Sequence, residues 1–248
     1  MVFPLYDNNP FAFQTPPYVS WGLIAANIAV FIYMLSIEPA TNAETAVLLS
    51  LAFTPSAFGH ANATLRAVPW EITLVSYSFL HASWLHVIGN MAFLWVFGDD
   101  VEEALGHVRF FVFYLLCATA GALAFWLSDP ASAVPLIGAS GAIAGVVGAY
   151  LFLHPCRKIW VLAFMRLPLK LAAEWVIGFW IALQLINIFV GADKEVAWWT
   201  HIGGLTAGAL LVVLMRRPGV KLFDCDADRM LQERAPPPKR WPRRVDTQ

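Results

Sequence analysis

Six long apolar windows constrain the fold of this 248-residue chain more than any other feature. A helix needs about 20 apolar residues to cross the hydrocarbon core of a bilayer, which is roughly 30 Å thick. The windows lie at residues 19–36, 80–98, 108–128, 139–155, 171–191 and 198–215. Charged residues make up 13% of the chain, whereas they make up about 25% of a typical soluble domain. These features predict an all-α membrane protein built as a compact bundle of six transmembrane helices.

The fourth window is short, because a helix of about 17 residues spans only about 25 Å. A helix that begins near Ser140 starts below the membrane surface, and the preceding stretch SAVPLIGA then enters the membrane as irregular chain. Irregular backbone is tolerated at that depth only where protein or a water-filled cavity covers it. The short window therefore predicts a cavity next to Ser140.

Basic residues predict the orientation. All of the 16 Lys and Arg residues except Arg66 and Lys194 fall in or next to the loops after the second and fourth windows, or in the C-terminal tail. Because Lys and Arg concentrate on the cytoplasmic side of membrane proteins, we expect both termini in the cytoplasm. The N-terminus carries no cleavable signal, so we expect the first window to be retained. A net charge of −1 without a basic stripe argues against nucleic acid as a partner.

Three segments are expected along the chain. Residues 1–18 form a short cytoplasmic N-terminus, residues 19–215 form the membrane domain, and residues 216–248 form a basic, Pro-rich cytoplasmic tail. We expect the tail to be disordered, and either solvated or resting on anionic lipid. The long first external loop, at about residues 37–70, contains an apolar run too short to cross a bilayer. The cysteines form no paired framework and no C-x-x-C motif: Cys117, Cys156 and Cys225.

Polar side chains inside three of the windows fall at a similar depth. They are His81, His86 and Asn90 in the second window, Ser140 in the fourth and His201 in the sixth. In the expected orientation these windows run from outside to inside, and each polar group lies in the outer part of its window. His86 and Asn90 are four residues apart and share a helix face. Because polar groups inside a membrane are costly, we expect them to line one cavity open to the outside.

Small residues mark two helix faces that can approach each other closely. The fourth window has a G-x-x-x-G pattern at Gly141 and Gly145, and the sixth has His201 followed by Gly204 and Gly208. Such faces let two helix backbones pack against each other in a membrane. If these two faces meet, the serine of the fourth window lies opposite the histidine of the sixth.

Ser140 and His201 are candidates for a nucleophile and its base, because serine catalysis needs a base within hydrogen-bonding reach. His86 and Asn90 are candidate donors to an oxyanion. The carboxylates of the windows fall toward the cytoplasmic side, so the pattern predicts a dyad rather than a Ser-His-Asp triad. Two alternatives remain open: Ser140 serves only helix packing, or His81 and His86 are core histidines or ligands of a metal or a transported ion. The H-x-x-x-x-H spacing differs from that of an H-E-x-x-H metal site.

Four motifs together resemble the rhomboid family of intramembrane serine proteases. They are HASWLHVIGN from His81, VEEALG from Val101, GASG from Gly138 and HIGGLTAG from His201, and the resemblance covers about residues 70–215. It implies that Ser140 attacks a peptide carbonyl while His201 acts as general base and then as general acid. It also implies that the oxyanion and the substrate are bound by His86, Asn90 and Gly138. The resemblance further implies that four residues support the site: His81, Gly141, Gly204 and Gly208.

The resemblance also implies the setting of the reaction. Expected partners are transmembrane protein substrates and the lipid bilayer, with no cofactor and no metal. Separately from the resemblance, the short termini and the size of the chain predict a bacterial inner membrane. The fifth window resembles the lateral gate of the family. Where some relatives place an aromatic ring against the histidine, this chain has Ala144. Either another group, such as Trp198 or Trp199, positions His201, or the ring is held more loosely. Where some relatives carry a Trp-Arg pair in the first external loop, this chain has Ile72 followed by Thr.

Overall fold

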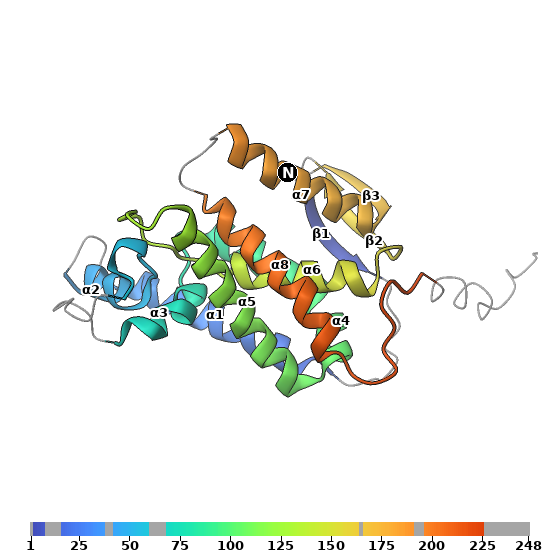
Figure 1. The fold of residues 1–248 in the computed structure, drawn as a ribbon, viewed down its shortest axis with the longest axis horizontal. Helices are drawn as coiled ribbons and strands as arrows, with labels where there is room; N and C mark the ends of the chain where they lie inside the picture. The colour runs from blue at the N-terminus through green and yellow to red at the C-terminus, as the bar shows by residue number, and fades with distance from the viewer. Residues whose placement is uncertain are drawn as a thin grey trace, which may run out of the picture.

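The computed structural model describes residues 2–7, 16–37, 42–59, 68–163, 166–190 and 196–225, and most of them are helical (Figure 1). The elements follow one another as β1 (Val2–Asp7), α1 (Tyr18–Ser36), α2 (Asn42–Leu51), η1 (Pro55–Ala57), α3 (Trp70–Ser76), η2 (Tyr77–Phe79), α4 (Trp84–Leu105), α5 (His107–Ser128), α6 (Ser140–Leu153), β2 (Lys158–Ala163), β3 (Leu167–Ala172), α7 (Ala173–Val190) and α8 (Trp198–Met215).

Within the described ranges, four helices are each long and apolar enough to cross a membrane: α1, α5, α7 and α8. Their bounds agree with the first, third, fifth and sixth apolar windows to within two residues at each end. The segment α3–η2 passes the same test only together with α4, from which it is bent by 89°. With 14 residues, α6 is too short to cross by itself. The chain is thus an integral membrane protein with four such helices, or five if the bent pair is one span.

Helix α6 lies at the centre of the bundle, between α4, α5 and α8 (Figure 1). Every residue from Gly141 to Tyr150 is buried, so this helix has no face left for lipid. The small-residue faces of α6 and α8 meet, as the sequence predicts. Gly204 and Gly208 lie so close to the carbonyl oxygens of Gly141 and Gly145 that neither has room for a Cβ atom. Because both contacts advance in the same direction along the chain, α6 and α8 are parallel.

The carboxylate of Glu102, near the end of α4, caps the first turn of α1. Its oxygens accept hydrogen bonds from the backbone N–H groups of Val19 and Ser20, at 2.9 and 2.7 Å, and from the Ser20 hydroxyl. The Nδ1 atom of His107 lies 2.5 Å from the same carboxylate. The first N–H groups of a helix have no partner inside it, and its N-terminus attracts negative charge. Glu102 thereby ties α1 to the junction of α4 and α5.

A three-stranded antiparallel sheet lies beside α7, which departs from the all-α expectation (Figure 1). Strand β2 is central, with Val2 opposite Ala163 in β1 and Lys158 opposite Ala172 in β3. Each strand has six residues, which is too short to stand out in a search for windows of about 20 apolar residues. The alternate burial of β2, with Ile159 and Val161 inside, is the period of a strand rather than of a helix.

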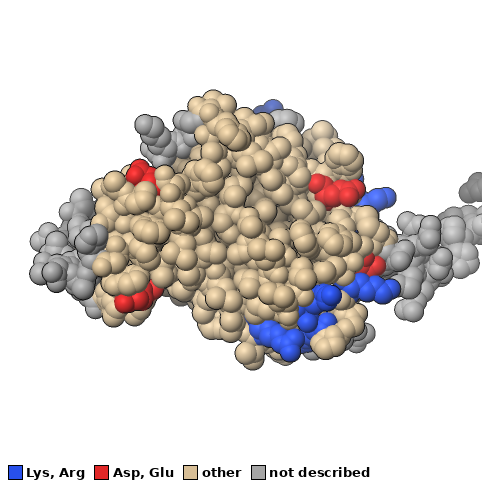
Figure 2. Space-filling view, in the orientation of Figure 1, with Lys and Arg blue, Asp and Glu red and all other residues tan. Residues whose placement is uncertain are grey.

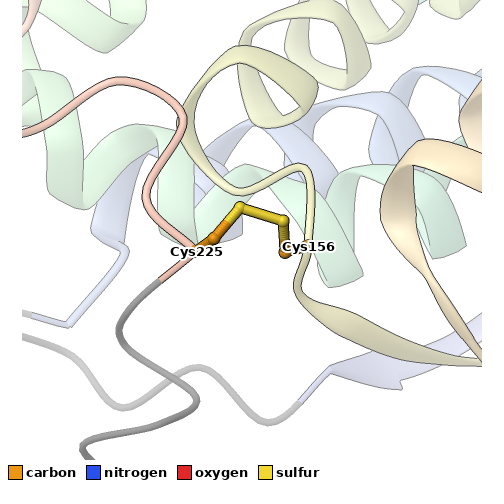
Figure 3. Close-up of a disulfide and its surroundings, with 2 residues drawn as sticks. All are labelled: Cys156 and Cys225. Atoms are coloured by element: carbon orange, nitrogen blue, oxygen red, sulfur yellow. A yellow bond between two sulfur atoms is a disulfide. The ribbon is translucent and has the colours of Figure 1, made fainter.

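A disulfide joins Cys156, just after α6, to Cys225, at the end of the described chain (Figure 3). The two cysteines are 69 positions apart, and the sequence shows no pairing pattern that connects them. Next to the disulfide, the backbone N–H groups of Phe223 and Asp224 donate to the carbonyl oxygens of Phe152 and Leu153. These bonds satisfy carbonyls that the end of a helix leaves without a partner. The segment after α8 therefore caps α6.

Most of the surface seen in Figure 2 carries no charged side chains. Figure 2 shows Lys and Arg gathered over the end of α8, with a broad uncharged face beside them. Large apolar side chains on the outside of the helices, such as Leu214 at 80% and Phe189 at 86% exposure, belong to such faces. Extended exposed apolar surface is the ordinary state of a protein that lies in lipid. Two basic residues used for the orientation, Arg66 and Lys194, lie outside the described residues, as does the tail from residue 226.

Candidate active site

Ser140 and His201 lie within hydrogen-bonding distance of each other. Ser140 is the first residue of α6, and His201 lies in the first turn of α8. The Oγ atom of Ser140 is 2.9 Å from Nε2 of His201. The parallel packing of the two helices through Gly141 and Gly204 brings these first turns together. The sequence predicts this juxtaposition, and a hydroxyl at this distance from an imidazole nitrogen can transfer its proton.

The chain that leads into α6 is irregular, and its last four residues, 136–139, are largely covered by protein. Leu136 exchanges two backbone hydrogen bonds with Phe53, at 2.7 and 3.2 Å, and the N–H of Ser56 donates to the carbonyl of Ser132. Phe53 and Ser56 belong to the long loop between α1 and α4. This pairing satisfies backbone groups that would otherwise lack partners at membrane depth. The expectation of covered irregular backbone before Ser140 therefore holds for residues 136–139, whereas residues 133–135 are exposed in the structure.

Gly138 presents the backbone just before Ser140 to two polar side chains of α4. Its φ of +113° is a conformation that side-chain-bearing residues rarely adopt. A Cβ atom at this position would lie 2.5 Å from Nε2 of His86 and 3.8 Å from Nδ2 of Asn90. The N–H of Gly138 donates to the carbonyl of Tyr77, which fixes the turn. His86, Asn90 and Gly138 therefore lie close together, and Gly138 precedes the serine by two positions.

His81 contacts both His86 and Asn90. The amide Nδ2 of Asn90 is 2.9 Å from Nε2 of His81, and the rings of His81 and His86 are 5.0 Å apart. An amide that donates one hydrogen to His81 keeps its second hydrogen for another acceptor. Among the side chains that the structure describes, no group of three His, Cys, Asp or Glu residues gathers as a metal site.

Two residues of α7 hold the other side of the His201 ring. The Oε1 atom of Gln184 lies 2.8 Å from Nδ1 of His201, and Gln184 is only 3% exposed. The ring of Trp180 lies 5.8 Å from the imidazole, in a tilted arrangement. The ring of Trp198 also contacts His201, edge to face at 6.1 Å. Of the two tryptophans that the sequence offers for this contact, Trp198 therefore makes it, and Trp199 is 45% exposed.

The sequence reasoning missed Gln184 and the contact of Trp180 with the histidine. One signal was available, because these two residues are four positions apart and so share a helix face. A glutamine in the middle of an apolar window is costly in lipid and therefore points to the inside of a bundle. The ring and amide contacts to His201 thus come from α7 and from Trp198, and not from the position of Ala144.

Comparison with known proteins supplies the family. A family model of the rhomboid domain matches residues 68–218, which is more than half of the chain. The chain belongs to the rhomboid family. The matched range contains Ser140, His201 and the polar residues of α4, so the rhomboid domain of this chain is the part that carries the site.

Several curated proteins are similar to this rhomboid. Rhomboid protein 1, mitochondrial, of Saccharomyces cerevisiae is 32% identical over 149 residues, covering 56% of this chain and 40% of that protein. RHOMBOID-like protein 1 of Arabidopsis thaliana is 31% identical over 147 residues, covering 59% and 35%. Rhomboid protease GluP of Bacillus subtilis is 28% identical over 208 residues, covering 84% and 36%. The chain spans less than half of the length of each of these three relatives.

Proposed function

We propose that this rhomboid is an intramembrane serine endopeptidase, a hydrolase that cleaves transmembrane protein substrates within or near the bilayer with a Ser140–His201 dyad. The observation that carries the proposal is the 2.9 Å separation between Oγ of Ser140 and Nε2 of His201. Membership in the rhomboid family supports it, and one relative of this chain bears the name rhomboid protease. No cofactor is part of the proposal.

The dyad performs acyl transfer in two steps. Ser140 Oγ attacks the carbonyl carbon of the scissile peptide bond while its proton moves to Nε2 of His201. The tetrahedral intermediate collapses when His201 gives this proton to the leaving amine, which leaves an ester on Ser140. Water then attacks the ester with His201 again as the base, and the carboxylic product leaves as the serine regains its proton.

The oxyanion that forms on the carbonyl oxygen needs donors already in place. His86, Asn90 and the backbone N–H of Ser140 are the proposed donors. His81 supports them by holding the amide of Asn90, at 2.9 Å. Gly138 has no side chain, and the His86 ring packs directly against it, so the substrate backbone would approach Gly138 only where the His86 side chain turns aside.

Supporting roles fall to the glycines between the two helices of the dyad. Gly141, Gly204 and Gly208 let α6 and α8 pack without intervening side chains, which sets the separation of Ser140 and His201.

We also propose six crossings of the bilayer, with α6 as a short central helix and the bent pair α3–α4 as one crossing. Both termini face the cytoplasm of a bacterium and the site opens to the outside of its inner membrane. The bias of Lys and Arg supports this orientation. Strand β1 pairs with β2, which follows the basic loop after α6, so the N-terminus and that loop lie at one end of the molecule.

The test is covalent labelling of the purified protein in detergent with a fluorophosphonate probe, together with cleavage of a single-span reporter protein in liposomes. We expect the probe to modify Ser140, as located by peptide mass spectrometry. Ser140→Ala removes both labelling and cleavage, because no nucleophile remains, and His201→Ala lowers both by about 100-fold or more because the base is lost.

The matched control is Ser128→Ala, which removes an exposed hydroxyl at the end of α5 and leaves the dyad intact. It should label and cleave as the wild type does. Cleavage that survives Ser140→Ala would disprove the dyad, and loss of cleavage on adding a chelator would favour a metal enzyme. A folded wild-type protein that neither labels nor cleaves would favour a relative that only binds membrane proteins.

A further inference from the structure

The two nitrogens of the His201 ring have separate partners from separate helices. Nε2 faces Ser140 of α6 at 2.9 Å, and Nδ1 faces the Oε1 atom of Gln184 of α7 at 2.8 Å. Gln184 is almost completely buried, at 3% exposure. A buried amide with a short bond to the candidate base has a fixed position from which to act on it.

The partner of Nδ1 decides which nitrogen can act as the base. A neutral imidazole has one N–H donor and one acceptor nitrogen. The carbonyl oxygen of Gln184 only accepts, so its bond to Nδ1 requires the hydrogen on Nδ1. Nε2 then carries the lone pair, and this is the nitrogen that must take the proton of Ser140. The other tautomer would point an N–H at the serine and could not accept its proton.

We propose that Gln184 is the positioning residue of this rhomboid, selecting the tautomer and orientation of His201 in which Nε2 accepts the proton of Ser140. It fills the role that a carboxylate fills in a Ser-His-Asp triad, with a neutral amide in its place. Gln184 does not touch the substrate and takes no proton. The inference rests on the proposed function, since a base needs positioning only if Ser140 is a nucleophile.

Helix α7, which supplies this bond, is the least embedded of the helices around the site. The side chains of Ala173, Ile177 and Gln184 are buried, whereas those of Trp175 and Phe179 are 72% and 56% exposed. Figure 1 shows α7 at the edge of the bundle, beside the sheet. Trp180 lies one turn from Gln184 and contacts the same ring at 5.8 Å. The contact of Gln184 with His201 therefore exists only while the buried face of α7 is docked on α8.

Two substitutions separate positioning from packing. Gln184→Met keeps the length and volume of the side chain and removes the strong acceptor, whereas Gln184→Glu keeps an acceptor oxygen at the cost of a buried carboxyl group. If Gln184 positions His201, the Glu variant retains more activity than the Met variant. If it only fills space, the order is reversed, because methionine suits a buried apolar site better.

The experiment measures kcat and KM for the reporter protein and the rate of fluorophosphonate labelling at Ser140. We expect Gln184→Met to lower kcat and the labelling rate by about 10-fold to 100-fold, with little change in KM. This is at or below the roughly 10²-fold to 10⁴-fold that a general base contributes, because His201 itself remains. Gln184→Glu should recover most of this loss. The matched control is Leu183→Met, the same replacement residue one position away, which should leave both rates unchanged.

Outcomes for this inference and for the proposed function are distinct. A wild-type protein without labelling at Ser140 would end the proposed function itself. An active wild type with equal rates in Gln184→Met, or with the Met variant more active than the Glu variant, would overturn the role of Gln184 alone. Thermal unfolding shows whether each variant is folded, and Gln184→Ala replaces Gln184→Met if the latter does not fold.

Discussion

At the scale of single residues, the hydrogen bond between Asn90 and His81 orients one of the proposed donors to the oxyanion. An amide nitrogen has two hydrogens, and donation of one to Nε2 of His81, at 2.9 Å, fixes the plane of the amide. The second hydrogen then has a fixed direction before the substrate arrives. Donors that are oriented in advance stabilise a developing charge without reorganisation at the moment of reaction.

Asn90→Ala and His86→Ala should each lower kcat by about 10²-fold to 10³-fold, because each removes one of the proposed donors to the oxyanion. KM should change little, since the charge develops only in the transition state. Steady-state cleavage of the reporter protein measures both constants. Ile88→Ala is the matched control, because Ile88 lies on the same helix between them and is 51% exposed. An unchanged kcat in both donor variants would place the oxyanion elsewhere.

The sequence predicts some of these residues better than others, for a physical reason. Ser140 and His201 are surrounded by small residues that fix which helix faces meet, so their juxtaposition follows from the pattern. Gln184 has no such pattern, because its partner depends on how α7 is rotated about its own axis. That rotation is set by packing against neighbouring helices, which a single window of apolar residues does not encode.

At the scale of elements, the contact between α6 and α8 determines the separation of the dyad. Gly208 lies against the carbonyl of Gly145, with no room for a Cβ atom. The parallel contact of Gly204 with Gly141 lies one turn nearer to the site. A side chain at either position pushes the two helices apart and moves His201 away from Ser140.

Gly208→Ala should destabilise the fold by about 1–3 kcal/mol, the usual cost of overpacking a well-packed core. Cleavage should fall with it because the dyad widens. Thermal unfolding and reporter cleavage measure the two effects. Gly178→Ala on α7 is the matched control, since a Cβ atom there meets nothing within 4 Å. A Gly208→Ala variant as stable and active as this control would mean that α6 and α8 do not pack as described.

Which elements the sequence predicts depends on their length and environment. The long windows predict α1, α5, α7 and α8 well, because hydropathy averaged over about 20 residues gives a strong signal. Helix α4 runs past its window to Leu105, since the interior of the protein buries Asp100 and Glu102. The sheet is missed because its strands pair residues 2–7 with residues near 160, and no local pattern encodes that pairing.

At the scale of the whole molecule, several connections meet at one end. The backbone N–H of Arg217 donates to the carbonyl of Ala104, Asp7 of β1 accepts a hydrogen bond from the hydroxyl of Tyr150 at 2.6 Å, and the disulfide joins Cys156 to Cys225. The ends of α4, α6 and α8 therefore lie together with the sheet, while Ser140 and His201 lie at the first turns of their helices. Among the described residues, the Lys and Arg side chains at the start of α5, between α6 and α7 and after α8 thus lie at the opposite end from Ser140 and His201.

The disulfide allows the proposed orientation to be tested, because its chemistry depends on the compartment. Arg157 and Lys158 follow Cys156, and Arg217 and Lys221 precede Cys225, so the positive-inside rule puts this end in the cytoplasm. Glutathione and thioredoxin keep cytoplasmic thiols reduced. The two cysteines should therefore be free thiols in a living cell and pair only when the protein meets an oxidising buffer.

We expect a membrane-impermeant maleimide to leave the protein unmodified in intact cells and to modify Cys156 and Cys225 once inside-out vesicles are made, without prior reduction. Cys117 is 0% exposed and should not react under either condition, which provides an internal control. Gel-shift counting of the added groups measures the result. Modification in intact cells, or modification that requires a reductant in fresh vesicles, would put this end in an oxidising compartment and reverse the proposed orientation, with the dyad then facing the cytoplasm.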